Sequence, residues 1–110
     1  MISTLMKLLT SERCVPTMKF YISGKITGQA NYLSLFRLAE IELKRLGYKA
    51  LNPTLLPANH DKTWNSFMRE DLKALLDCDG IYMLDNHSRS PGAMIELRLA
   101  QSLNFKVLYQ

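Results

Sequence analysis

Four short apolar runs, separated by three segments of helical periodicity, constrain the fold of this 110-residue chain more than any other feature. The predicted strands and helices follow one another at 19–23, 31–46, 48–51, 64–77, 79–84, 91 onward and 105–109. Strands that alternate with single helices along the chain are typical of a parallel sheet with right-handed crossovers. The sequence therefore predicts a small α/β domain: a doubly wound, Rossmann-like or flavodoxin-like parallel sheet of four strands with three helices.

The first 17 residues differ from the rest of the chain. The apolar residues between Ile2 and Leu9 have the spacing of a short amphipathic helix, and the segment around Pro16 breaks it. A regular domain begins at Met18, which is also a plausible alternative start. We therefore expect residues 1–17 to be an extension without a catalytic role, either a short helix or disordered. Residues 18–110 are expected to form one domain.

Composition excludes several classes of protein. The net charge is +4 and no cluster of Lys and Arg stands out, so a nucleic acid polymer is not an expected partner, whereas acidic small molecules such as nucleotides are compatible. No apolar stretch reaches about 18 residues, so no membrane span is expected. Cys14 and Cys78 are predicted to be free thiols in a reducing cytoplasm. His60, His87 and Cys78 lack metal-ligand spacing, and neither a metal nor another cofactor is expected.

The stretch from Ser88 to Glu96 opens the last helix and carries an unusual carboxylate. Ser90 is the predicted N-cap and Pro91 the first helical residue. The free N–H groups of the first turn could receive an anion, which the missing side chain of Gly92 would let approach closely. At about 100° per residue, Glu96 falls in the middle of the apolar face of the helix. A carboxylate there is costly unless a partner holds it or a site uses it.

Asp71 has the same unusual position on the preceding helix. It falls at the centre of an apolar face formed by Trp64, Phe67, Met68, Ala74 and Leu75. Two core-facing carboxylates on successive helices that flank one strand suggest a shared functional site. The alternative is a structural network with a basic side chain. We expect Trp64 to belong to the core, and a lid over a base is the alternative.

The loop Gly24-Lys25-Ile26-Thr27-Gly28 follows the first strand directly. It is neither a Walker A motif nor a dinucleotide-binding G-x-G-x-x-G motif, so it is either a tight turn or a phosphate or ribose loop. Ligands of doubly wound sheets bind beyond the carboxyl ends of the strands. The loops 24–29, 52–62 and 85–91 meet there, close to Asp71 and Glu96, and we predict a ligand site at this edge.

Three motifs together resemble the nucleoside 2-deoxyribosyltransferase superfamily. They are FYISGKITG at 20–28, DLKAL at 71–75 and SPGAMIEL at 90–97. The chain looks closest to small phage and prophage proteins of the DUF4406 group, and it is similar to 2′-deoxynucleoside 5′-phosphate N-hydrolases. The resemblance covers residues 18–110.

The resemblance implies a role for each matched residue. Glu96 matches the nucleophile that attacks the anomeric carbon, Asp71 the carboxylate that assists the departing base, and Tyr21 the hydroxyl that orients the nucleophile. Contacts to the 5′-phosphate and to the sugar and base are implied for Ser90, Gly92, Ser23, Gly24, Lys25, Ile26 and Gly28.

These matches lead us to expect an N-glycosidase or deoxyribosyltransferase that acts on a nucleotide or nucleoside. A homodimer or higher homo-oligomer is expected from the same likeness. Two alternatives are a nucleotide-binding module without chemistry and a protein in which both carboxylates belong to a buried structural network.

Overall fold

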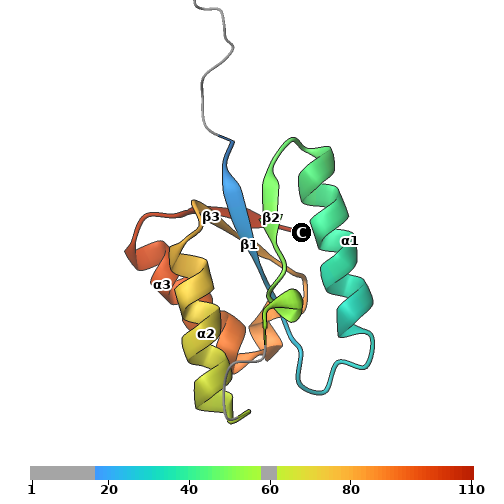
Figure 1. Cartoon of the computed structure of the whole chain (residues 1–110), viewed down its shortest axis with the longest axis vertical. Coiled ribbons are helices and arrows are strands. Elements are labelled where there is room, and N and C mark those ends of the chain that lie inside the picture. The colour runs from blue at the N-terminus through green and yellow to red at the C-terminus, as the bar shows by residue number, and fades with distance from the viewer. Residues whose placement is uncertain (1–16, 58–61) are drawn as a thin grey trace, which may run out of the picture.

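The computed structural model describes residues 17–57 and 62–110 (Figure 1). The elements in chain order are β1 Lys19–Ser23, α1 Tyr32–Arg45, β2 Lys49–Leu51, η1 Pro53–Leu55, α2 Trp64–Leu76, β3 Gly80–Met83, η2 His87–Arg89, α3 Pro91–Ser102 and β4 Lys106–Tyr109. The seven predicted strands and helices are all present, and the short η1 and η2 turns are additional. The predicted extension 1–17, apart from Thr17, lies outside the described residues, as do Cys14 and His60.

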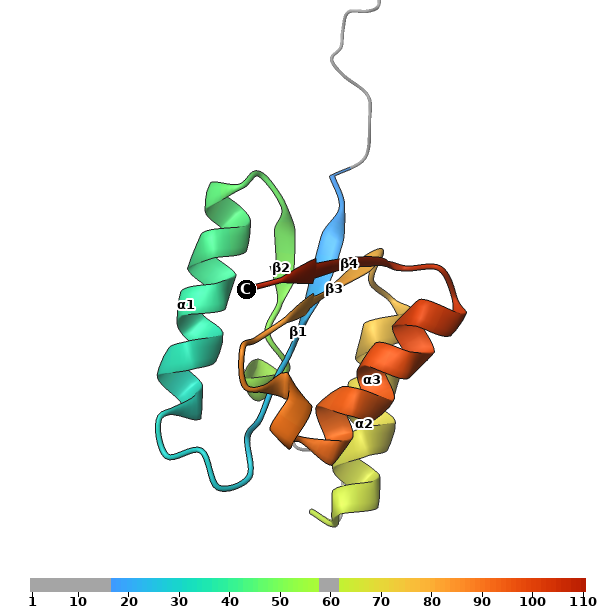
Figure 2. The same cartoon turned by 180° about the vertical axis from the view of Figure 1, so that it is seen from behind.

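The four strands form one parallel sheet in the order β2-β1-β3-β4. Helix α1 covers one face of this sheet, and α2 and α3 cover the other (Figures 1 and 2). This arrangement confirms the predicted doubly wound α/β fold. The chain leaves β1 toward β2 on one side and later continues from β3 on the other side, so the carboxyl ends of β1 and β3 mark the switch point of the sheet.

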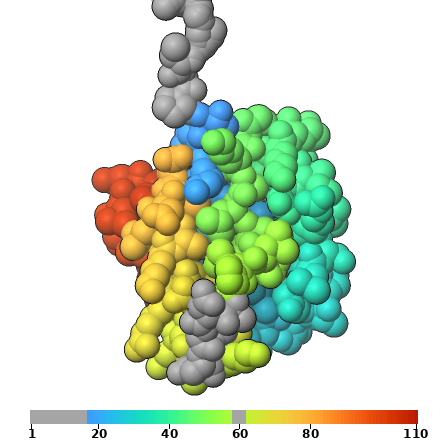
Figure 3. All heavy atoms as spheres, in the orientation of Figure 1, coloured from blue at the N-terminus to red at the C-terminus, as the bar shows by residue number. Residues whose placement is uncertain are grey.

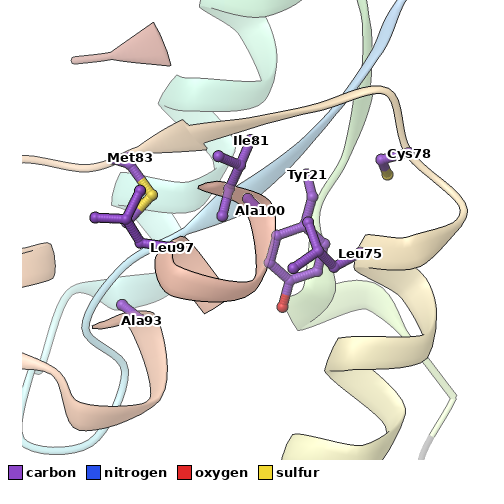
Figure 4. Close-up of a cluster of buried hydrophobic side chains, with 8 residues drawn as sticks. All are labelled: Tyr21, Leu75, Cys78, Ile81, Met83, Ala93, Leu97 and Ala100. Atoms are coloured by element: carbon purple, nitrogen blue, oxygen red, sulfur yellow. The ribbon is translucent and has the colours of Figure 1, made fainter. Parts of the chain in front are cut away.

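Alternate residues of the central strands face opposite helices. Phe20 and Ile22 of β1 pack in the cluster beneath α1. Tyr21 lies on the other face with residues of β3, α2 and α3, and Figure 4 shows its ring among them with the hydroxyl at the end remote from the strand. Ser23 shares this face with Tyr21, because side chains two positions apart in a strand point the same way.

The apolar face of α2 is only partly covered. Met68 and Leu75 are buried, but Trp64 and Phe67 remain 53% and 46% exposed. The expectation that Trp64 belongs to the core is therefore wrong. Both residues belong to the first turn of α2, and this end of the helix extends past the carboxyl ends of the strands (Figure 1).

Helix α3 begins as predicted. Ser90 is the N-cap, Pro91 is the first helical residue, and the Ala93 N–H donates to the Ser90 Oγ at 3.2 Å. None of the helices in the described part of the chain has the length and apolar character needed to cross a membrane. Cys78 is a buried free thiol, and burial raises its pKa to about 11.

Gly80 at the start of β3 leaves no room for a side chain. A Cβ there would lie 2.4 Å from the Phe20 ring and 2.7 Å from the Lys106 carbonyl oxygen. We therefore predict that Gly80→Ala lowers the free energy of unfolding by about 1–3 kcal/mol, because a packed strand must shift. Urea denaturation monitored by circular dichroism measures this change. An unchanged unfolding midpoint would contradict the close packing of Gly80 against Phe20 and Lys106.

Candidate functional site

Two hydroxyl groups of β1 donate hydrogen bonds to the Glu96 carboxylate. The Tyr21 Oη donates to Glu96 Oε2 at 2.7 Å, and the Ser23 Oγ donates to Oε1 at 2.7 Å. Glu96 is 5% exposed and projects from the second turn of α3, whereas both donors belong to β1. The contact joins the first strand to the last helix, so the carboxylate has a fixed position at the switch point of the sheet.

Burial determines the ionisation of the carboxyl groups at this point. It raises the pKa of Glu96 to about 7, although the hydrogen bonds from Ser23 and Tyr21 act in the opposite direction and Asp71 adds a smaller increase. Burial, together with the nearby Glu70, raises the pKa of Asp71 to about 6. Burial and the charges of Glu96 and Asp71 also raise the pKa of the Tyr21 phenol, which keeps it a neutral donor. The site thus holds two carboxyl groups that both titrate near neutrality.

Glu40 is a second buried carboxylate in the described part of the chain, and its surroundings differ from those of Glu96. Glu40 of α1 is 7% exposed and forms ion pairs with Arg37 at 3.0 Å and Lys44 at 3.3 Å. Burial opposes its ionisation, but hydrogen bonds from Arg37, Lys44 and Asn52 outweigh this effect and lower its pKa. Within residues 17–57 and 62–110, by contrast, no ion pair joins a cation to Glu96 or Asp71.

Glu96 and Asp71 line a cavity of about 580 Å³. The β1–α1 loop, η1, α2 and the start of α3 enclose it, and Figure 3 shows η1, in green, between α1 and α2. The predicted site residues that line this cavity are Tyr21, Gly24, Lys25, Ile26, Asp71, Ser90, Gly92 and Glu96. Ser23 does not line the cavity itself, but its hydroxyl donates a hydrogen bond to Glu96, which does.

Backbone conformation and close packing explain why glycine occupies three positions of the predicted site. Gly28 does not line the cavity, and its φ of +77° is a conformation that favours glycine in a turn. A Cβ at Gly24 would lie 2.6 Å from Leu84, so this residue permits close packing of the loop on the residue that follows β3. A Cβ at Gly92 would lie 3.1 Å from the Met68 sulfur. Met68 thus occupies the position toward which a side chain at Gly92 would point, while the approach of an anion to the backbone N–H groups there stays a prediction.

The rim near the start of α3 nevertheless suits an anion. The Ser90 Oγ accepts a hydrogen bond from Ala93, which leaves its own proton available for a ligand. The Gly92 N–H lies in the first helical turn, where backbone donors lack helical partners. Lys25 and Arg89 line the same cavity and supply positive charge. A helix N-terminus with these groups can bind a phosphate or a carboxylate.

Sequence reasoning missed most of the aromatic side of the cavity. Tyr32, Trp64 and Phe67 contribute rings to its wall, with Pro53 and Leu56 beside them. The available signal was a tryptophan at the first residue of a helix that follows a long loop at the predicted ligand edge.

Asn86 is a second residue that the sequence did not single out. It is 7% exposed, accepts a hydrogen bond from the Lys25 N–H at 2.9 Å, and donates to the Gln29 side chain at 3.5 Å. These bonds tie the β1–α1 loop to the β3–α3 connection. Asn86 thus fixes the loop that carries Lys25 and Ile26 relative to the N-terminus of α3.

The fold and site define a class of small α/β domain with a cavity at the switch point of a parallel sheet. Residues 18–109 match DUF4406, a domain of unknown function, and the chain belongs to this family. No curated protein matches the chain. In the described part of the chain, no group of three or more His, Cys, Asp or Glu side chains is arranged to hold a metal ion.

The opposite environments of Glu96 and Glu40 predict opposite effects of neutralisation. The pKa of Glu96 rises from 4.5 to about 7 on folding, so its ionisation costs stability as pH increases through this interval, by about 3 kcal/mol at most. Glu96→Gln should therefore raise the melting temperature at pH 8 and have little effect at pH 4. Glu40→Gln should lower it at pH 8, because the charge of Glu40 is paired.

Thermal unfolding of both variants and the wild type at pH 4, 6 and 8 checks this pair of predictions. A loss of stability in Glu96→Gln at pH 8 comparable to that in Glu40→Gln would show that Glu96 is a structural carboxylate.

Proposed function

We propose that this protein cleaves the base–sugar bond of a nucleoside or deoxynucleoside 5′-monophosphate, with Glu96 as the nucleophile. The observation that carries the proposal is a buried carboxylate held by two hydroxyls and, among the described residues, by no ion pair, on the wall of a cavity that Asp71 also lines. The resemblance to the nucleoside 2-deoxyribosyltransferase superfamily supports the same reaction. Such an uncompensated carboxylate reduces stability, and a functional requirement explains why the chain contains it.

Glu96 acts on the anomeric carbon of the sugar. One of its oxygens forms a bond to C1′ as the bond from C1′ to the base nitrogen breaks, and the bonding electrons leave with the base. Positive charge that develops on the sugar is stabilised by the adjacent carboxylate, as in retaining glycosidases. Water then attacks C1′ and releases the sugar phosphate and Glu96. A second base in place of water makes the reaction a transfer.

Asp71 supplies the proton that the departing base requires. Its pKa near 6 leaves a useful protonated fraction at neutral pH, and it lines the same cavity as Glu96. After the base has left, the ionised Asp71 can accept a proton from the attacking water.

The cavity lining contains groups suited to each part of a nucleotide. Ser90, the Gly92 N–H, Lys25 and Arg89 are proposed to bind the 5′-phosphate. The aromatic wall, which we define as Tyr32, Trp64 and Phe67, is proposed for the base, since nucleobases stack on such rings. The carboxyl groups of Glu96 and Asp71 are proposed to act at the sugar.

The decisive experiment is a chromatographic assay for free base with a panel of deoxynucleoside and ribonucleoside monophosphates and the matching nucleosides. We predict base release from at least one monophosphate by the wild type, and a loss of at least about 10³-fold in Glu96→Gln, because the amide cannot form the covalent intermediate. Glu42→Gln is the matched control, since Glu42 is partly exposed on α1, away from the cavity, and paired with Arg45. Addition of a second base distinguishes transfer from hydrolysis.

Absence of base release by the folded wild type from every substrate would contradict the enzyme proposal. Nucleotide binding without turnover, measured by calorimetry, would then identify the chain as a binding module.

The aromatic wall gives a separate prediction. Trp64→Ala should raise KM by about 10-fold, because a base–aromatic stacking contact contributes about 1–3 kcal/mol. The melting temperature should change little, because Trp64 is half exposed. Trp64→Phe should restore much of the affinity, and Leu76→Ala, an exposed apolar position at the other end of α2, is the control. Equal KM values for Trp64→Ala and the wild type would exclude stacking on this ring.

A further inference from the structure

We propose that Ser23 is a positioning residue, whose hydroxyl, together with that of Tyr21, fixes the orientation of the Glu96 carboxylate toward the cavity. The inference rests on the proposed function, in which Glu96 is the nucleophile. It assigns to Ser23 a role different from the sugar or base contact that the family resemblance implies, because the Ser23 hydroxyl is used by Glu96.

The backbone of Ser23 is rigidly held. Ser23 is 1% exposed, pairs with Met83 of β3, and accepts a hydrogen bond from the Leu84 N–H at 2.9 Å. A serine side chain has a single rotatable bond before its oxygen, so a fixed backbone leaves few positions for the hydroxyl. The position of the Ser23 Oγ is therefore determined by the central pair of strands rather than by a mobile loop.

The two donors act on different oxygens of the same carboxylate. Ser23 binds Oε1 and Tyr21 binds Oε2, each at 2.7 Å. A single donor would let the carboxylate plane rotate about that contact, whereas two donors define the plane. Each oxygen has two lone-pair directions, so one remains on each for a substrate atom.

The hydroxyls of Ser23 and Tyr21, rather than a charged group, stabilise the Glu96 carboxylate directly. Asp71 of α2 raises the pKa of Glu96, and Glu70 lines the same cavity. In the described part of the chain, neither Lys25 nor Arg89 forms an ion pair with Glu96, although both line the cavity. Burial raises the pKa of Glu96, and the hydrogen bonds of Ser23 and Tyr21 oppose this increase. Ser23 thus has a second effect: it favours the ionised form that a nucleophile requires.

Ser23→Ala tests the inference, because it removes only the hydroxyl. We expect the pKa of Glu96, measured by carbon-detected NMR of the labelled carboxyl group, to rise by about 1. We also expect kcat to fall about 10-fold at pH 7 and the acidic limb of its pH profile to move upward. Tyr21→Phe should raise the same pKa through the other oxygen. Ser66→Ala, which removes another buried serine hydroxyl, should leave it unchanged.

The outcomes separate this inference from the proposed function. A Glu96 pKa in Ser23→Ala equal to that of the wild type would overturn the role of Ser23, whatever the activity. A raised pKa in a protein without base-release activity would support the carboxylate geometry and reject the reaction. Ser23→Thr retains the hydroxyl and should retain a pKa close to the wild-type value. If Ser23→Ala does not fold, Ser23→Cys, which has a weaker donor of similar size, provides the same titration.

Discussion

The hydrogen bonds between β1 and Glu96 are the contact on which the rest of the site depends. A carboxylate without a cation is stable inside a small domain only if neutral donors replace water, and here two hydroxyls do so. This arrangement restricts the neighbouring elements: β1 must place both hydroxyls on one face, and α3 must bring its second turn against that face. The cavity forms around the fixed carboxylate because the helix starts and strand ends meet at the switch point.

Much of the fold could be predicted because its signals are local. The spacing of apolar residues located every strand and helix, and Ser90 with Pro91 marked the start of α3. The difference between the buried carboxylates was also present in the sequence. Glu40 has Arg37 and Lys44 three and four residues away on its own helix, whereas no cation occupies the equivalent positions around Glu96 or Asp71.

Other features depend on contacts between distant segments, which helical periodicity does not reveal. The periodicity assigned Trp64 to the same face as Leu75, but it contains no information on how far α2 extends beyond the sheet. The Ser23 bond to Glu96 and the Asn86 bonds to the β1–α1 loop join residues more than 50 positions apart. A side chain at Gly92 would meet Met68 of α2, and the glycine in the sequence does not show which residue packs against it.

The alternation along β1 links the chemistry of the site to the accuracy of folding. Phe20 and Ile22 fill the core beneath α1, while Tyr21 and Ser23 support Glu96 on the opposite face. A shift of β1 by one residue would exchange these two sets and place apolar side chains where the hydroxyls belong. A misregistered molecule would therefore bury a carboxylate with no donors, so the requirements of the site penalise an error in strand pairing. The polar site thereby contributes to the choice of a single native register, although it reduces the stability of that state.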